Sequence, residues 1–60
     1  MTQNELYEYI KNKKYLCHLC QNLRKEVILY GLEAIKNYKG MACKGIEDMQ
    51  IKFSEVTDNP

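Results

Sequence analysis

The sequence predicts an all-α fold, in which a long N-terminal amphipathic helix is followed by a shorter C-terminal helix that folds back on it as a hairpin. Three observations lead to this prediction. Apolar residues recur at steps of three and four from Leu6 to Tyr38, as one face of an α-helix requires. No proline interrupts that stretch. A second apolar series with helical spacing follows between residues 46 and 56.

Capping residues mark both ends of the expected long helix. Thr2 is suited to the N-cap position, and Glu5 stands three residues later, which is the pattern of a capping box. At the other end, a lysine precedes Gly40, a residue that readily adopts positive φ. Two sites weaken an unbroken helix: the polar run at 12–14, and Gly31, which costs about 1 kcal/mol relative to alanine. A turn at either site is the alternative to one continuous rod.

The C-terminal segment 46–56 allows two interpretations. Helical spacing is shown by Ile46, Met49, Phe53 and Val56. Strand-like alternation is shown by Met49, Ile51 and Phe53. We favour the helix because a lone strand has no pairing partner in a helical chain, unless a second copy supplies one. Residues 1–60 are expected to form one small domain, and the polar residues 54–60 are expected to fray.

Length argues for a second copy of the chain. A helix from residue 3 to 39 would be roughly 55 Å long, whereas a compact domain of this size is about 27 Å across. The C-terminal helix would cover only part of the apolar stripe, so we expect a homodimer arranged as a helical bundle or coiled coil. The expected dimer or partner interface consists of Leu16, Cys20, Leu23, Val27, Tyr30, Ala34 and Tyr38. A second contact face is expected from Tyr15, Leu19, Leu29 and Leu32, which lie off the main stripe.

Charge is unevenly distributed along the chain. The whole sequence has a net charge of +1, but residues 1–45 carry +4 and residues 46–60 carry −3. Such a basic body and acidic tail can pair head to tail within a dimer. The net charge of +1 is low for binding driven by phosphate contacts. A nucleic-acid-binding helical dimer is therefore an alternative, which would use Lys11, Lys13, Lys14, Lys25, Lys36 and Lys39.

The tetrapeptide from Cys17 to Cys20 is a C-x-x-C motif, which can begin a zinc site when further ligands follow. Only Cys43 follows, and the sole histidine, His18, is predicted on the opposite, polar face of the helix. We therefore expect the two motif cysteines to be small buried core residues, with no metal ligand and no cofactor. A zinc-stapled dimer that uses Cys17 and Cys20 of each copy is the alternative. Redox chemistry is not expected, because both cysteines are predicted in mid-helix.

No residue set specifies a reaction. The sequence shows no carboxylate pair, no glycine-rich phosphate loop, no signal peptide and no apolar run long enough to span a membrane. An odd number of cysteines fits a reducing compartment. We expect a small, non-catalytic cytoplasmic regulator that binds and modulates a larger protein, by inhibition, through its helical surface.

Overall fold

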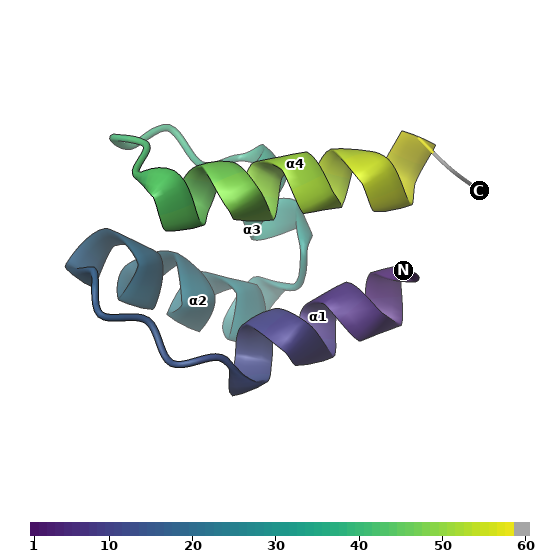
Figure 1. Ribbon diagram of the computed structural model, residues 1–60, viewed down its shortest axis with the longest axis horizontal. Coiled ribbons are helices and arrows are strands. Elements are labelled where there is room, and N and C mark those ends of the chain that lie inside the picture. The colour runs from purple at the N-terminus through teal and green to yellow at the C-terminus, as the bar shows by residue number, and fades with distance from the viewer. Residues whose placement is uncertain (59–60) are drawn as a thin grey trace.

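Helices make up all the regular structure in residues 1–58, the part of the chain that the computed structural model describes. They are α1 (Gln3–Asn12), α2 (His18–Tyr30), α3 (Glu33–Lys36) and α4 (Lys44–Asp58), shown in Figure 1. The all-α prediction is confirmed, and segment 46–56 is a helix rather than a strand. The expected order of lengths is wrong, because the C-terminal helix, at 15 residues, is the longest of the four.

The single long N-terminal helix is also wrong, since that stretch of chain is three helices. It breaks at both weak points of the sequence. Lys13 and Cys17 have extended backbones on either side of the first break. At the second break Gly31 has a φ of 86°, a conformation that favours glycine and ends α2. Breaking the rod costs a few helical hydrogen bonds, but it lets α1 bury its apolar face against α2 and α4.

Side-chain hydrogen bonds hold the ends of α1 in place. The predicted capping box is present, with Thr2 N donating to Glu5 Oε1 at 2.8 Å and Glu5 N donating to Thr2 Oγ1 at 3.1 Å. Arg24, on α2, donates to the carbonyl oxygen of Lys11 in the last turn of α1. That bond satisfies one of the carbonyls that a helix leaves unpaired at its C-terminus, and it fastens α1 to α2.

The order of the helices in space brings two N-termini together. In Figure 1, α2 and α4 begin at the same end of the molecule, while α1 begins beside the end of α4. The short α3 packs against α2 and α4. The molecule measures 31 × 20 × 18 Å, so it is far shorter than the roughly 55 Å of the expected rod.

The core is made within one chain and is drawn from all four helices. Its buried side chains are Leu6, Ile10, Cys20, Leu23, Val27, Ile35, Ile46, Met49 and Val56. Three residues of the expected dimer interface, Cys20, Leu23 and Val27, therefore have no surface left for a second copy. The break in the rod explains this, because α4 and α1 cover the stripe that a dimer was expected to cover.

The remaining members of the expected contact surfaces divide into two groups. Partly buried against the core are Ala34 and Tyr38 of the expected interface, and Tyr15, Leu19 and Leu32 of the second face. Leu16 is 97% exposed, Tyr30 73% and Leu29 72%. Leu16 and Tyr30 adjoin the two breaks, where the chain leaves the helical path that would have kept them on the apolar stripe.

Two further predictions concern the C-terminal end and the membrane. α4 includes residues 54–58 of the expected frayed tail, and residues 59–60 lie outside the described part; fraying stays a prediction. None of the helices in residues 1–58 combines the length and the apolar run that a bilayer span requires. The cytoplasmic location stays a prediction as well.

A pair of leucines from the expected interface tests the core. Leu23→Ala removes a fully buried side chain and is expected to cost about 2–5 kcal/mol, enough to unfold much of so small a domain. Leu16→Ala changes an exposed side chain and should alter stability by less than about 0.5 kcal/mol. Urea denaturation followed by circular dichroism at low protein concentration measures both. Equal effects of the two substitutions would contradict this core.

Candidate functional site: a cluster of three cysteines

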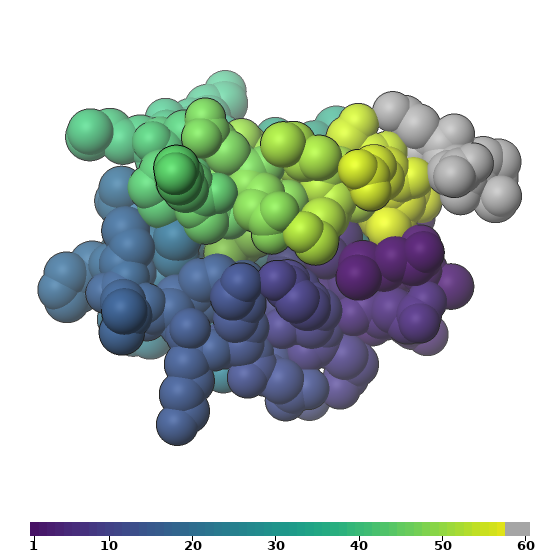
Figure 2. All heavy atoms as spheres, in the orientation of Figure 1, coloured from purple at the N-terminus to yellow at the C-terminus, as the bar shows by residue number. Residues whose placement is uncertain are grey.

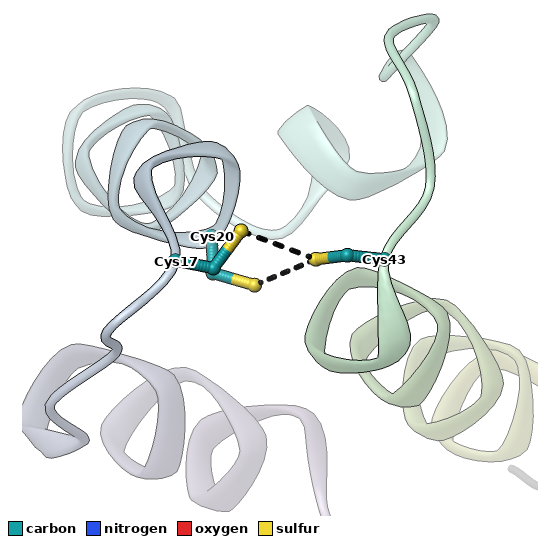
Figure 3. A group of neighbouring side chains, drawn as sticks. All are labelled: Cys17, Cys20 and Cys43. Carbon is teal, nitrogen blue, oxygen red and sulfur yellow. Dashed lines mark hydrogen bonds between the residues drawn. The ribbon is translucent and has the colours of Figure 1, made fainter.

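All three cysteines of the chain meet at the end of the molecule where α2 and α4 begin (Figure 3). The Sγ of Cys43 lies 3.1 Å from the Sγ of Cys20 and 3.7 Å from the Sγ of Cys17. The three sulfurs all lie within 4.8 Å of one another. Cys17 is exposed, Cys20 is buried and Cys43 is half-buried, so the cluster reaches from the core to the surface.

Each cysteine lies in the first turn of a helix or directly before it. Cys17 is the N-cap of α2, and Cys20 is the third residue of that helix. This spacing puts both sulfurs on one side of the first turn, as Figure 3 shows. Cys43 directly precedes α4, and its carbonyl accepts a hydrogen bond from Glu47 N at 2.9 Å. Two helix N-termini, each with a partial positive charge, therefore face the same three sulfurs.

The expected mid-helix position of the C-x-x-C motif is wrong. It rested on an unbroken rod, whereas the first break ends just before the motif and places it at a helix N-terminus. Burial of Cys20 in the core agrees with the prediction, but Cys17 is exposed. His18 has no ring nitrogen in the cluster, as its predicted position on the opposite face implied. Nothing in the sequence indicated that Cys43 would join the motif, because that contact depends on how α4 packs.

The environment shifts the pKa values of two of the cysteines in opposite directions. The pKa of Cys43 is lowered, first by the hydrogen bond from Cys20 and then by one from the backbone N–H of Ile46. Burial, followed by the hydrogen bond with Cys43, raises the pKa of Cys20 to about 12. These opposite shifts favour a proton on Cys20 and a thiolate on Cys43. Lowered thiol pKa values at helix N-termini are typical of reactive and metal-binding cysteines.

Gly45 permits the close approach of α4 to the motif. A Cβ atom at this position would lie 2.5 Å from the Sγ of Cys20, which is far inside normal contact distance. Tyr15 lies on the same side, 3.8 Å from that Cβ position. A residue with a side chain would therefore displace either the Sγ of Cys20 or the first turn of α4, and either shift would change the spacing of the sulfurs.

The spacing of the sulfurs suits a thiophilic metal ion. Zinc lies about 2.3 Å from each thiolate in a tetrahedral site, which separates the sulfurs by about 3.8 Å. The two sulfur–sulfur distances of 3.1 and 3.7 Å, with all three sulfurs within 4.8 Å, need only small adjustments to reach that value. Among residues 1–57, whose side chains the structure describes, no histidine, aspartate or glutamate joins the three cysteines. One chain thus offers three ligands and leaves a fourth position for water or an added ligand.

Comparison with known proteins adds nothing to this geometry. No protein-family model, curated protein or solved structure matches the chain. The expected roles as a regulator or as a nucleic-acid-binding protein stay predictions.

Alkylation tests the proton distribution within the cluster. At neutral pH, iodoacetamide should modify Cys43 faster than Cys20, because Cys43 is the more accessible and its lowered pKa gives it more thiolate. Peptide mass spectrometry after short exposure to the reagent measures the order. The advantage of Cys43 should shrink as the pH rises and Cys20 loses its proton. Faster labelling of Cys20 in the folded protein would contradict the arrangement.

Proposed function

We propose that this protein is a small metal-binding helical module, in which Cys17, Cys20 and Cys43 hold a thiophilic divalent ion of the zinc class. The single observation that carries the proposal is the meeting of three sulfurs, from two segments 23 or more residues apart, within 4.8 Å. Zinc is the ion named because it favours thiolates and accepts four-coordinate sites with cysteine ligands.

Electrostatics supports binding of a cation at this position. Three thiolates carry a charge of −3 once the ligands lose their protons, and a divalent ion leaves −1. The N-termini of α2 and α4 partly offset that remaining charge. Binding releases the protons held by the thiols, above all the one on Cys20, whose pKa is raised to about 12. Affinity should therefore fall as the pH falls.

The role proposed for the ion is structural. It would join the first turns of α2 and α4, which the described chain otherwise connects only through the core and the segment around α3. A domain of this length buries too little surface to be very stable, and small folds commonly use a metal as a staple. Among the side chains that the structure describes, no carboxylate or imidazole belongs to the cluster, so none is placed there to act as a general base for an ion-bound water. Non-catalytic action, expected from the sequence, is kept in this proposal.

Metal titration tests the proposal directly. Under reducing conditions the protein should bind one Co²⁺ or Zn²⁺, and Co²⁺ should give the charge-transfer absorption of thiolate ligands. Replacing any one cysteine by serine should weaken binding more than the ~10–100-fold typical of losing an outer-shell partner. Cys43→Ser is decisive because it leaves the C-x-x-C motif intact. His18→Ala, within the motif but outside the cluster, is the matched control and should bind normally.

Thermal unfolding provides a second measurement in the same experiment. At an ion concentration about 100 times the dissociation constant, binding adds about 2.7 kcal/mol, which corresponds to a rise in Tm of more than about 10 °C for a domain of this size. A chelator should reverse the rise. Absence of thiolate absorption, or equal binding by Cys43→Ser, would overturn the site. Air oxidation to a Cys20–Cys43 disulfide in place of metal binding would assign the cluster to redox chemistry instead.

Gly45→Ala distinguishes an effect on metal affinity from an effect on helix stability. Alanine has a higher intrinsic helix propensity than glycine, by about 1 kcal/mol in a helix interior, so the change should not by itself reduce the helix content of α4. The added Cβ would collide with the Sγ of Cys20, so metal affinity should fall at the same time. Circular dichroism and Co²⁺ titration measure the two effects on one sample. Unchanged or higher affinity would contradict the close approach.

A further inference from the structure

A basic groove lies at the first break of the chain, next to the segment that leads into Cys17. It is lined by Lys13, Lys14, Tyr15, Leu16, Gln21, Arg24 and Lys25. Four of these residues are cationic and none is acidic. The only ion pair within residues 1–58 joins Lys52 and Asp48 on α4, so no ion pair there engages the four cations of the groove.

Several groups in the groove are held in fixed positions. The guanidinium of Arg24 donates to the carbonyl of Lys11. The ammonium of Lys13 lies 2.9 Å from the hydroxyl of Tyr9 and above the ring of Tyr15, at 5.4 Å from its centroid. Lys14 and Lys25 are exposed at the edge. Leu16, at 97% exposure, is the most exposed large apolar side chain among the residues whose burial the structure describes. The groove therefore combines cationic side chains, two of which are held by hydrogen bonds, with the exposed apolar side chain of Leu16.

The outer face of α4 has the complementary character. A shallow depression there is lined by Glu47, Gln50, Ile51 and Ser54. Glu47, Ile51 and Glu55 are spaced four residues apart, so they form one ridge along the helix. Ile51 is 59% exposed and stands between two exposed carboxylates. This ridge presents an apolar side chain flanked by negative charge, whereas the groove presents an apolar side chain flanked by positive charge.

We propose that the basic groove docks the acidic ridge of α4 from a second copy of this chain. In a two-fold pair, the groove of each copy contacts the ridge of the other copy. Both surfaces are then used within the dimer, so no third copy is added. Figure 2 shows the blue α1–α2 connection and the green-to-yellow α4, the segments that carry the groove and the ridge, on the same view of the molecule. A net charge of +1 leaves little overall repulsion between copies.

This pairing differs from the dimer expected from the sequence. The expected interface used Cys20, Leu23 and Val27, which the monomer buries. The groove and ridge use side chains that the monomer leaves exposed. An acidic protein surface suits the groove better than nucleic acid does. Leu16 cannot hydrogen-bond to a base or a phosphate, whereas it can make an apolar contact with Ile51. The proposal does not rest on the metal site, since no residue of the groove or ridge is a proposed ligand.

Sedimentation velocity on the full chain, kept reduced, tests the pairing from micromolar to millimolar protein. The average mass should rise toward twice the monomer mass and fall again at high salt, which screens the paired charges. Lys14→Glu/Lys25→Glu should raise the dissociation constant more than about tenfold, because it places like charges together. Glu47→Lys/Glu55→Lys should do the same. Leu16→Ser, which cannot disturb the core, should also weaken the pair.

A mixing experiment provides the decisive result. The two charge-reversed variants, each unable to pair alone, should pair with each other because both contacts again join opposite charges. Lys36→Glu/Lys39→Glu is the matched control: it changes net charge by the same amount with exposed lysines outside the groove. It should pair with itself, and it should pair with Glu47→Lys/Glu55→Lys more weakly than Lys14→Glu/Lys25→Glu does, because one of the two contacts then joins like charges.

Three results would overturn the proposal. One is a monomer at every concentration, and another is a mass that grows beyond two copies. The third is a pair that survives both charge reversals. Single-stranded oligonucleotide should bind Lys14→Glu/Lys25→Glu and Lys36→Glu/Lys39→Glu equally weakly, because both have the same net charge; loss in the groove variant alone would assign the groove to nucleic acid instead.

Discussion

The burial of a single apolar face inside a chain of only 60 residues constrains everything else in this structure. A continuous helix would need a second molecule to cover that face. Breaks after Asn12 and at Gly31 let the chain cover the face itself, with α1 and α4 packed on α2. The loss of a few helical hydrogen bonds is small beside the apolar surface removed from water. Because the core is satisfied within one chain, any association must use other side chains.

The first break has a chemical consequence as well as a structural one. It ends immediately before the C-x-x-C motif, so the motif occupies the first turn of α2 instead of the middle of a rod. There the cysteines meet backbone N–H groups and the positive end of the helix. The parallel course of α4 adds Cys43 at the start of a second helix, and Gly45 leaves room for the contact. The turn that lets the chain bury its leucines thus also brings together the three cysteines for which we propose metal binding.

The two exposed surfaces that remain are also products of this folding. Leu16 lies in the extended connection after the first break, and it stands next to the lysines that made this segment polar. α4 turns its apolar side to the core through Ile46, Met49 and Val56, which leaves Ile51 and its acidic neighbours outward. The charge asymmetry between the two parts of the sequence becomes, in three dimensions, a basic groove and an acidic ridge. No residue lining the groove or the ridge is one of the three cysteines, so the proposed metal binding and the proposed self-association can be tested by different substitutions.

The sequence by itself determined the helical class, the capping box, the two breakable sites and most of the core, because these depend on local periodicity and on turn chemistry. Leu6, Ile10, Leu23, Val27 and Ile46 all follow from their spacing. Only the tertiary structure decided that both sites break, that Leu16 and Tyr30 leave the core, and that Cys43 joins Cys17 and Cys20. The physical reason is that these outcomes depend on contacts between residues far apart in the chain. A weak site in a helix breaks when the break lets distant segments bury more apolar surface. That buried area cannot be read from the local sequence pattern.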